Sequence, residues 1–172
     1  MYMRSQTVFD ATWFGLPRVE LVGKLREQLV HKADRYPKLA IATKGYIDFL
    51  EAGGRVKLAD LTGKLLRRYL TRGIPVLTGL SSTWLYRTSR ELDDTTHDDL
   101  RGEPSGHFVV LYGYDRETRE VWVADPYAGN PFDGEARLYP VKIERLIASV
   151  LLGVVSYDCS LLVIEPHTDK QA

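Results

Sequence analysis

The sequence is poor in cysteine, and Cys159 is the only one among 172 residues. A single cysteine excludes an internal disulfide and a cysteine-rich metal site, and it is typical of a reducing compartment. The 23 basic and 23 acidic residues cancel, so no net charge attracts nucleic acid or an anionic membrane. No apolar run is long enough to cross a bilayer, and residues 1–5 lack the apolar core of a signal peptide. We therefore expect a cytoplasmic protein without nucleic-acid or membrane partners.

Predicted helices come first along the chain and most predicted strands follow them. Apolar residues recur at helical spacing through residues 18–32. A second helix begins at Pro37 and stops at Gly53, and Thr62 caps a third helix that ends at Gly73. The other predicted elements are strands at 74–77, 138–141 and 161–164 and a helix at 143–151.

This order of elements predicts an α+β fold in which N-terminal helices pack on an antiparallel sheet. The length and the 44% of hydrophobic residues suit one domain with a real core, residues 1–172. Residues 1–7 and the tail from 167 to 172 are expected to be frayed.

A long polar connection runs from Ser81 to Gly106 and contains four aspartates and His97. It lacks the alternating ligands and the central glycine of a calcium loop, so we interpret it as a solvated segment and predict no metal site. Because it ends beside His107, it could act as a lid or as a substrate wall.

Two apolar stretches, residues 106–114 and 121–126, predict a β-hairpin. If its turn centres on Arg116, His107 lies opposite Asp125 on one face, with Cβ atoms about 5 Å apart. A carboxylate beside an imidazole fixes its tautomer and stabilises its protonated form, as a general base in nucleophilic catalysis requires.

Two other interpretations of this hairpin stay open. A single histidine at a strand end is often only a half-buried polar residue, and Asp125-Pro126 is ordinary turn chemistry. A longer turn would also shift the register by one residue and place His107 and Asp125 on opposite faces.

The stretches 101–115 and 121–126 resemble the His and Asp blocks of the papain-like, bacteriocin-processing cysteine peptidases, peptidase family 39 of the cysteine class. Stand-alone bacterial relatives of that family are more similar still. The likeness runs from about Val8 to Pro166 and includes residues 9–14 and 72–77. The resemblance implies a papain-like fold, a peptide or protein substrate and no cofactor. It also implies that His107 is the general base and Asp125 its orienting acid.

The sequence departs from this family at the nucleophile. The family's cysteine opens an N-terminal helix in a Cys-Gly-Pro segment with a glutamine just upstream, where the helix N-terminus lowers the thiol pKa. Residues 1–7 contain Gln6 but no cysteine. Cys159 follows the His and Asp blocks and opens an apolar, strand-like run, so we expect a buried, unactivated thiol.

Serine offers no better nucleophile. Ser105 lies in Gly102-Glu103-Pro104-Ser105-Gly106, which lacks the spacing of a hydrolase elbow. Ser81 and Ser82 follow a predicted strand and could face the site. We assign substrate binding to four residues that flank the His–Asp pair: Ser81, Ser105, Gly106 and Tyr127.

Two functions follow from this pattern. The first is a truncated hydrolase, incomplete at the N-terminus, whose cysteine segment is missing from this chain. The second is a non-catalytic module of the same fold that binds an extended peptide. The encoding DNA upstream of Met1 would separate them, because a Cys-Gly-Pro segment in frame favours the hydrolase.

A missing N-terminal lobe would also uncover part of the sheet. The face concerned carries His107, Val109, Leu111, Val121 and Val123, and its exposure would promote self-association. A chain that stands alone would instead cover this face with its own helices, such as the one at residues 18–32.

Overall fold

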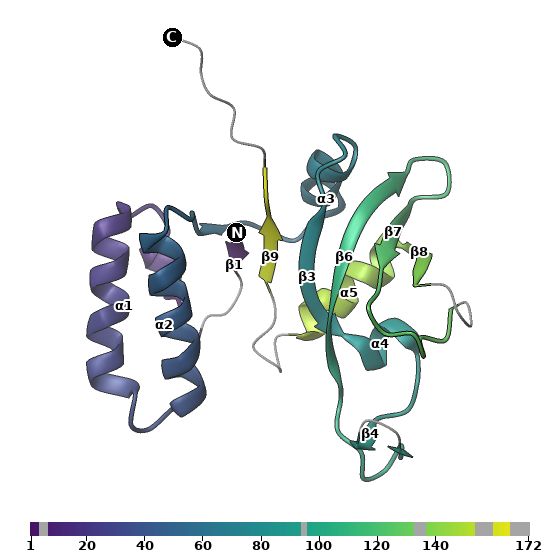
Figure 1. Cartoon of the computed structure of the whole chain (residues 1–172), viewed down its shortest axis with the longest axis horizontal. Coiled ribbons are helices and arrows are strands. Elements are labelled where there is room, and N and C mark those ends of the chain that lie inside the picture. Colours follow the sequence, from purple (N-terminus) through teal and green to yellow (C-terminus); the bar gives the residue numbers. More distant parts are fainter. Residues whose placement is uncertain (4–6, 94–95, 133–136, 154–159, 166–172) are drawn as a thin grey trace. The chain divides into compact units, whose positions relative to one another are not determined.

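The computed structural model describes residues 1–3, 7–93, 96–132, 137–153 and 160–165. The chain forms two compact units, Met1–Ala59 and Asp60–Ala172. Helices and strands divide as an α+β fold requires, which confirms the predicted class (Figure 1). Cys159 and the tail from His167 lie outside the described residues.

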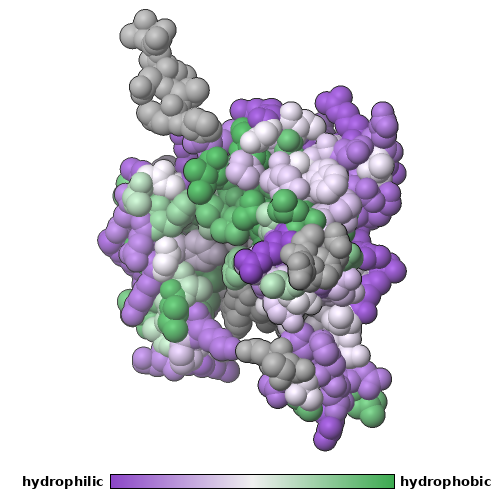
Figure 2. All heavy atoms as spheres, turned by 45° about the vertical axis from the view of Figure 1, so that its right-hand side comes forward, coloured by the Kyte–Doolittle hydropathy of each residue, from purple (hydrophilic) through white to green (hydrophobic). Residues whose placement is uncertain are grey.

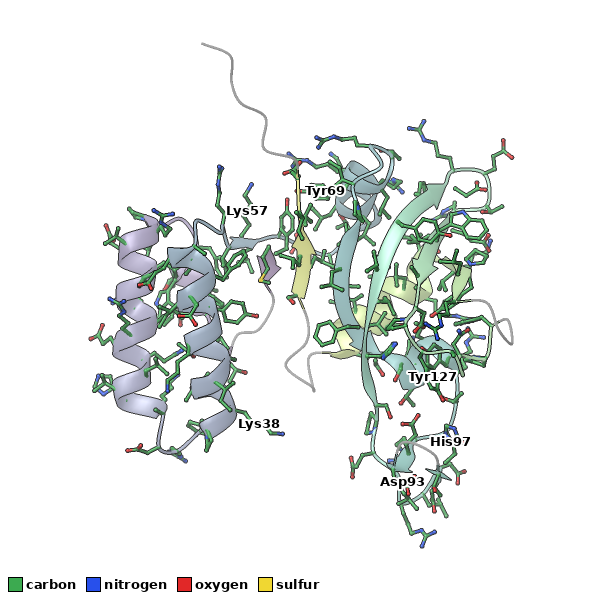
Figure 3. The ribbon with its side chains drawn as sticks, viewed as in Figure 1. Lys38, Lys57, Tyr69, Asp93, His97 and Tyr127 are labelled. Atoms are coloured by element: carbon green, nitrogen blue, oxygen red, sulfur yellow. The ribbon has the colours of Figure 1, made fainter. Side chains whose placement is uncertain are left out.

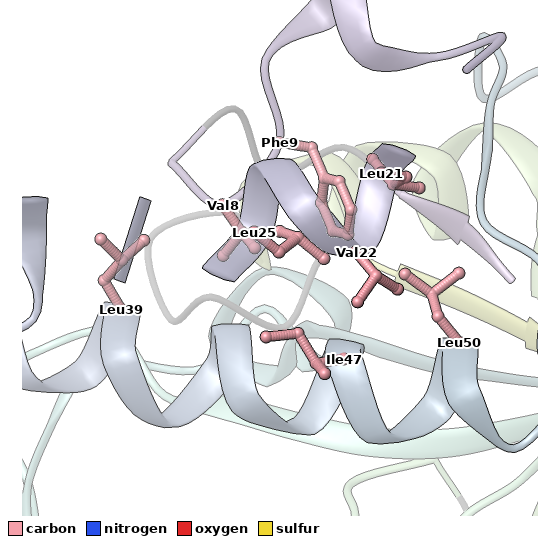
Figure 4. Packing of buried hydrophobic residues seen from close by; sticks show 8 residues of the cluster. All are labelled: Val8, Phe9, Leu21, Val22, Leu25, Leu39, Ile47 and Leu50. Atoms are coloured by element: carbon pink, nitrogen blue, oxygen red, sulfur yellow. The ribbon is translucent and has the colours of Figure 1, made fainter. Parts of the chain in front are cut away.

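The first unit is built on two helices, α1 (Arg18–Lys32) and α2 (Pro37–Glu51), at the predicted positions. Pro37 opens α2 because its fixed φ and missing N–H suit the first helical turn. Gly53 follows the helix with φ 94°, a conformation that favours glycine. The two helices and the segment before α1 bury a common apolar core (Figure 4), made by Val8, Phe9, Leu21, Val22, Leu25, Leu39, Ile47 and Leu50.

Residues 2–3 are part of the first unit. They form β1 (Tyr2–Met3), which pairs in parallel with β2 (Lys57–Leu58). The Met1 amino group donates a hydrogen bond to the Arg55 carbonyl at 2.8 Å, and the Lys57 N–H donates to the Met1 carbonyl. Backbone hydrogen bonds therefore join the first residues to the segment that follows α2.

The second unit is an antiparallel sheet in the order β9, β3, β6, β7, β8. Its strands are β3 (Val76–Ser81), β6 (Gly106–Asp115), β7 (Glu120–Ala124), β8 (Leu138–Lys142) and β9 (Ser160–Val163). Helix α3 (Gly63–Leu70) precedes the sheet, and the Thr62 hydroxyl caps it by accepting from the Leu65 N–H, as predicted. Helix α5 (Ile143–Leu152) crosses one face of the sheet and packs against β3 (Figure 1).

The sheet face that carries His107 is covered, so the exposure expected for a chain without an N-terminal lobe is not seen among the described residues. Val109, Leu111, Val121 and Val123 are at most 1% exposed, and α5 packs over this side of the sheet. A helix at this position was predicted, but its docking place could not be inferred from the sequence.

The exposed apolar residues of the sheet lie on its other face, which we call the open face. Strand alternation places five of them there, each 37–55% exposed. Hydrophobic side chains gather over these strands in Figure 2. The five are Leu77, Phe108, Tyr112, Trp122 and Leu138.

The connection between β3 and β6 contains structure that the sequence did not predict. It holds helix α4 (Ser82–Tyr86) and a hairpin of β4 (Glu91–Asp93) and β5 (Thr96–His97). The hairpin protrudes as a largely hydrophilic lobe (Figure 2). Among the described helices, none combines the length and apolar composition needed to cross a bilayer.

Candidate functional site

The imidazole of His107 and the carboxylate of Asp125 meet where β6 begins and β7 ends. His107 Nε2 lies 2.7 Å from Asp125 Oδ1, which confirms the predicted contact. The Asp125 side chain is fully buried, whereas the His107 side chain is 25% exposed. The pair therefore consists of a shielded carboxylate and an imidazole that a substrate can reach.

The hairpin register differs from the prediction, although the face is right. The turn spans residues 116–119, and Asp115 pairs with Glu120. This longer turn alone would put His107 and Asp125 on opposite faces, because it shifts the pairing by an odd number. An irregularity between Leu111 and Gly113 adds one residue to β6 and restores the original face. The two side chains are thus diagonal neighbours and not directly opposite.

Asp125 accepts four hydrogen bonds, two on each oxygen. Oδ1 lies 2.7 Å from His107 Nε2 and accepts from the Tyr127 N–H at 2.9 Å. Oδ2 accepts from the Tyr86 hydroxyl at 2.7 Å and from the Tyr139 hydroxyl at 2.5 Å. The carboxylate has no free position for a further donor.

These bonds determine the charge of Asp125. Burial by itself would raise the pKa of the carboxyl, but the bonds from His107, the two tyrosines and the Tyr127 backbone outweigh it. The pKa falls from 3.8 to about 2, so Asp125 is ionised at any physiological pH. Burial and the adjacent carboxylate raise the pKa of Tyr86 and Tyr139 far above the ordinary value, and both hydroxyls remain protonated donors.

The charge of Asp125 in turn fixes the tautomer of His107. An ionised carboxylate is an acceptor only, so the proton in the His107–Asp125 bond belongs to Nε2. In the neutral ring Nδ1 then carries the lone pair and can accept a proton. This is the arrangement that a general base needs.

Aromatic rings surround the pair. Tyr127, which is half exposed, makes an edge contact with the His107 ring at 6.2 Å between centroids. Phe132 packs on Tyr139 at 4.4 Å and on Tyr86 at 6.0 Å. The buried amide of Asn130 donates to the Tyr127 carbonyl and accepts from the Phe132 N–H, which holds this loop in place.

The predicted substrate-binding serines lie close to His107 but have structural partners. Ser81 pairs with Gly106 across β3 and β6, and its hydroxyl caps α4 by accepting from the Trp84 N–H. The Ser82 hydroxyl donates to the Ser105 carbonyl at 3.1 Å, and the Ser105 hydroxyl donates to Glu91 Oε2 at 2.5 Å. These bonds anchor the start of β6, and the substrate role of Ser81, Ser105, Gly106 and Tyr127 stays a prediction.

The β4–β5 hairpin is tied to the strand that bears His107. Glu91 forms an antiparallel bridge with Glu103, two residues before Ser105. Asp93 and His97 belong to the hairpin and Tyr127 to the loop after β7 (Figure 3). Within the described part of the chain, no three His, Cys, Asp or Glu side chains are grouped to hold a metal ion.

Tyr86 and Tyr139 also belong to this site, although neither was predicted from the sequence. A usable signal existed for Tyr139, because alternation along the predicted strand 138–141 puts it on the same face as Val141. Tyr139 pairs with Val123, two residues before Asp125. Tyr86 lies on a short helix in a segment of polar composition and gave no such signal.

A family model described as "Peptidase_C39 like family" matches residues 18–140, a stretch that includes both His107 and Asp125. Comparisons with curated proteins and with solved structures found no match.

Proposed function

The chain belongs to the Peptidase_C39-like family, and from this premise we propose that His107 and Asp125 are the general base and orienting acid of a peptidase-like centre. The observation that carries the proposal is the 2.7 Å contact between His107 Nε2 and a fully buried, ionised Asp125. In the proposed step, His107 Nδ1 takes the proton of a thiol as its sulfur attacks a peptide carbonyl. Asp125 stabilises the imidazolium that results.

We propose that the nucleophilic cysteine lies outside this sequence. Cys159 is the one cysteine of the sequence, and its context contains nothing that would activate a thiolate. The nearby hydroxyls of Ser81, Ser82 and Ser105 all make hydrogen bonds with backbone or carboxylate groups, which favours none of them as an attacking group. The substrate is an extended peptide, with Tyr127 as a wall beside His107.

The test is hydrolysis by a product of the extended reading frame. If the encoding DNA contains an in-frame Cys-Gly-Pro segment upstream of Met1, a protein that includes it should cleave peptides. His107→Ala should then lower kcat at least about 100-fold, since a general base contributes that much or more. Unchanged kcat in His107→Ala would contradict the proposal.

The second candidate is a peptide-binding module without catalysis, and the engaged hydroxyls near His107 favour it. In that case the 172-residue chain should bind an extended peptide with no turnover. Binding would shift the NMR signals of His107 and Tyr127, and a peptide that shifts neither would exclude this candidate.

A further inference from the structure

We propose that Tyr86 and Tyr139 are positioning residues, which hold the carboxylate of Asp125 so that Oδ1 stays on Nε2 of His107. The proposal rests on the proposed role of the His107–Asp125 pair and adds to it the groups that orient the acid. Neither tyrosine touches His107 by a hydrogen bond in the described structure, so each acts through Asp125.

One carboxylate oxygen of Asp125 binds the two tyrosines, and the other oxygen binds His107. Both tyrosine hydroxyls donate to Oδ2, whereas the imidazole and the Tyr127 N–H meet Oδ1. Rotation of the carboxylate about its Cβ–Cγ bond would break bonds on both oxygens at once. The two hydroxyls thus oppose rotation and keep one carboxylate oxygen directed at His107.

The two tyrosines come from different parts of the second unit. Tyr86 is the last residue of α4, and Tyr139 lies on β8 with 2% exposure. Phe132 contacts both rings. Because the rings are held by packing, a Tyr→Phe change removes one hydroxyl and leaves the surroundings in place.

A purely structural role would have a different signature. If the hydroxyls served only to satisfy a buried charge, their loss would lower stability without altering the His107 ring. If they position Asp125, their loss also loosens the bond to Nε2, and the neutral ring becomes a mixture of tautomers.

The experiment compares Tyr86→Phe, Tyr139→Phe and the double variant with the unmodified chain. Tyr112→Phe is the matched control, because Tyr112 lies on the open face. Long-range ¹H–¹⁵N NMR reports the tautomer of His107, and solvent exchange of its Nε2 proton reports the bond to Asp125. We expect roughly tenfold faster exchange in each single variant, a mixed tautomer in the double variant, and no change in Tyr112→Phe. An unchanged tautomer and exchange rate in the folded double variant would overturn the proposal.

Asp125→Asn separates this proposal from the proposed function. If this variant leaves the His107 spectrum unchanged, Asp125 does not determine the tautomer of His107 and the proposed function fails. If Asp125→Asn alters the spectrum but the tyrosine variants do not, only the positioning role fails. Should Tyr139→Phe prevent folding, Tyr86→Phe decides alone, because the Tyr86 ring is only partly buried.

Discussion

At the scale of single residues, Asp125 links the site to stability. Its pKa is lower in the folded chain, about 2 against 3.8, so the folded state favours the ionised form by about 2 kcal/mol. This stabilisation is fully present above about pH 4 and is lost as the pH falls towards about 2. Urea unfolding at a series of pH values should show the loss.

Asp125→Asn should remove the stabilisation that the ionised carboxylate gives to the folded state. We expect the variant to be less stable at neutral pH by about 2 kcal/mol and to lose less stability than the unmodified chain below pH 4. Asp48→Asn, at an exposed position of α2, controls for the loss of one negative charge. Equal acid sensitivity of the Asp125→Asn variant and the unmodified chain would show that Asp125 is not held as an anion by its four donors.

Cys159 supports a second prediction at this scale. It should react slowly with thiol-directed active-site reagents at neutral pH, because its sequence context contains nothing that would activate a thiolate. The 172-residue chain alone should therefore not hydrolyse peptides. Rapid labelling of Cys159 that His107→Ala abolishes would make it the nucleophile and contradict the proposed mechanism.

At the scale of elements, the end of α5 fixes the strand that pairs with His107. A Cβ added at Gly153 would lie 3.0 Å from the Leu80 Cα and 3.2 Å from its carbonyl carbon, and Leu80 pairs with His107. The backbone atoms of a strand cannot shift without a cost in free energy. Gly153→Ala should therefore lower the free energy of unfolding by about 1–3 kcal/mol.

Gly45→Ala is the matched control for this change. Gly45 lies inside α2 with nothing within 4 Å of an added Cβ, so alanine there should stabilise the helix by about 1 kcal/mol. Urea denaturation measures both variants. A neutral or stabilising Gly153→Ala would show that α5 and β3 do not pack as closely as described.

The elements also show what the sequence could and could not predict. Helices α1, α2 and α3 were predictable because apolar spacing, Pro37 and the Thr62 cap are local signals. The placement of His107 and Asp125 on one face followed from strand alternation, but the predicted register was wrong, and the face is kept only because the odd shifts from the longer turn and the extra residue leave an even net shift. The extra residue between Leu111 and Gly113 depends on the sheet around it, and no local sequence signal predicts it.

At the scale of the whole molecule, the open face is a surface suited to self-association. Its exposed aromatic residues include Phe108, Tyr112 and Trp122, and the Tyr112 and Trp122 rings lie 6.5 Å apart. We predict that the purified chain binds a hydrophobic dye and forms oligomers detectable by light scattering. Phe108→Ser and Trp122→Ser should reduce both signals, whereas Val30→Ser, at an exposed position of α1, should not. A dispersed monomer that binds no dye would contradict this expectation.

The proposed function depends most on one claim, that a buried anionic Asp125 holds His107 with Nδ1 free to act as a base. A long-range ¹H–¹⁵N NMR spectrum of the unmodified chain, recorded where the ring is neutral, tests this claim directly. We predict a single His107 tautomer with the proton on Nε2 in the unmodified chain, and the loss of this single tautomer in Asp125→Asn. A ring protonated on Nδ1, or an equal mixture of tautomers in the unmodified chain, would contradict it.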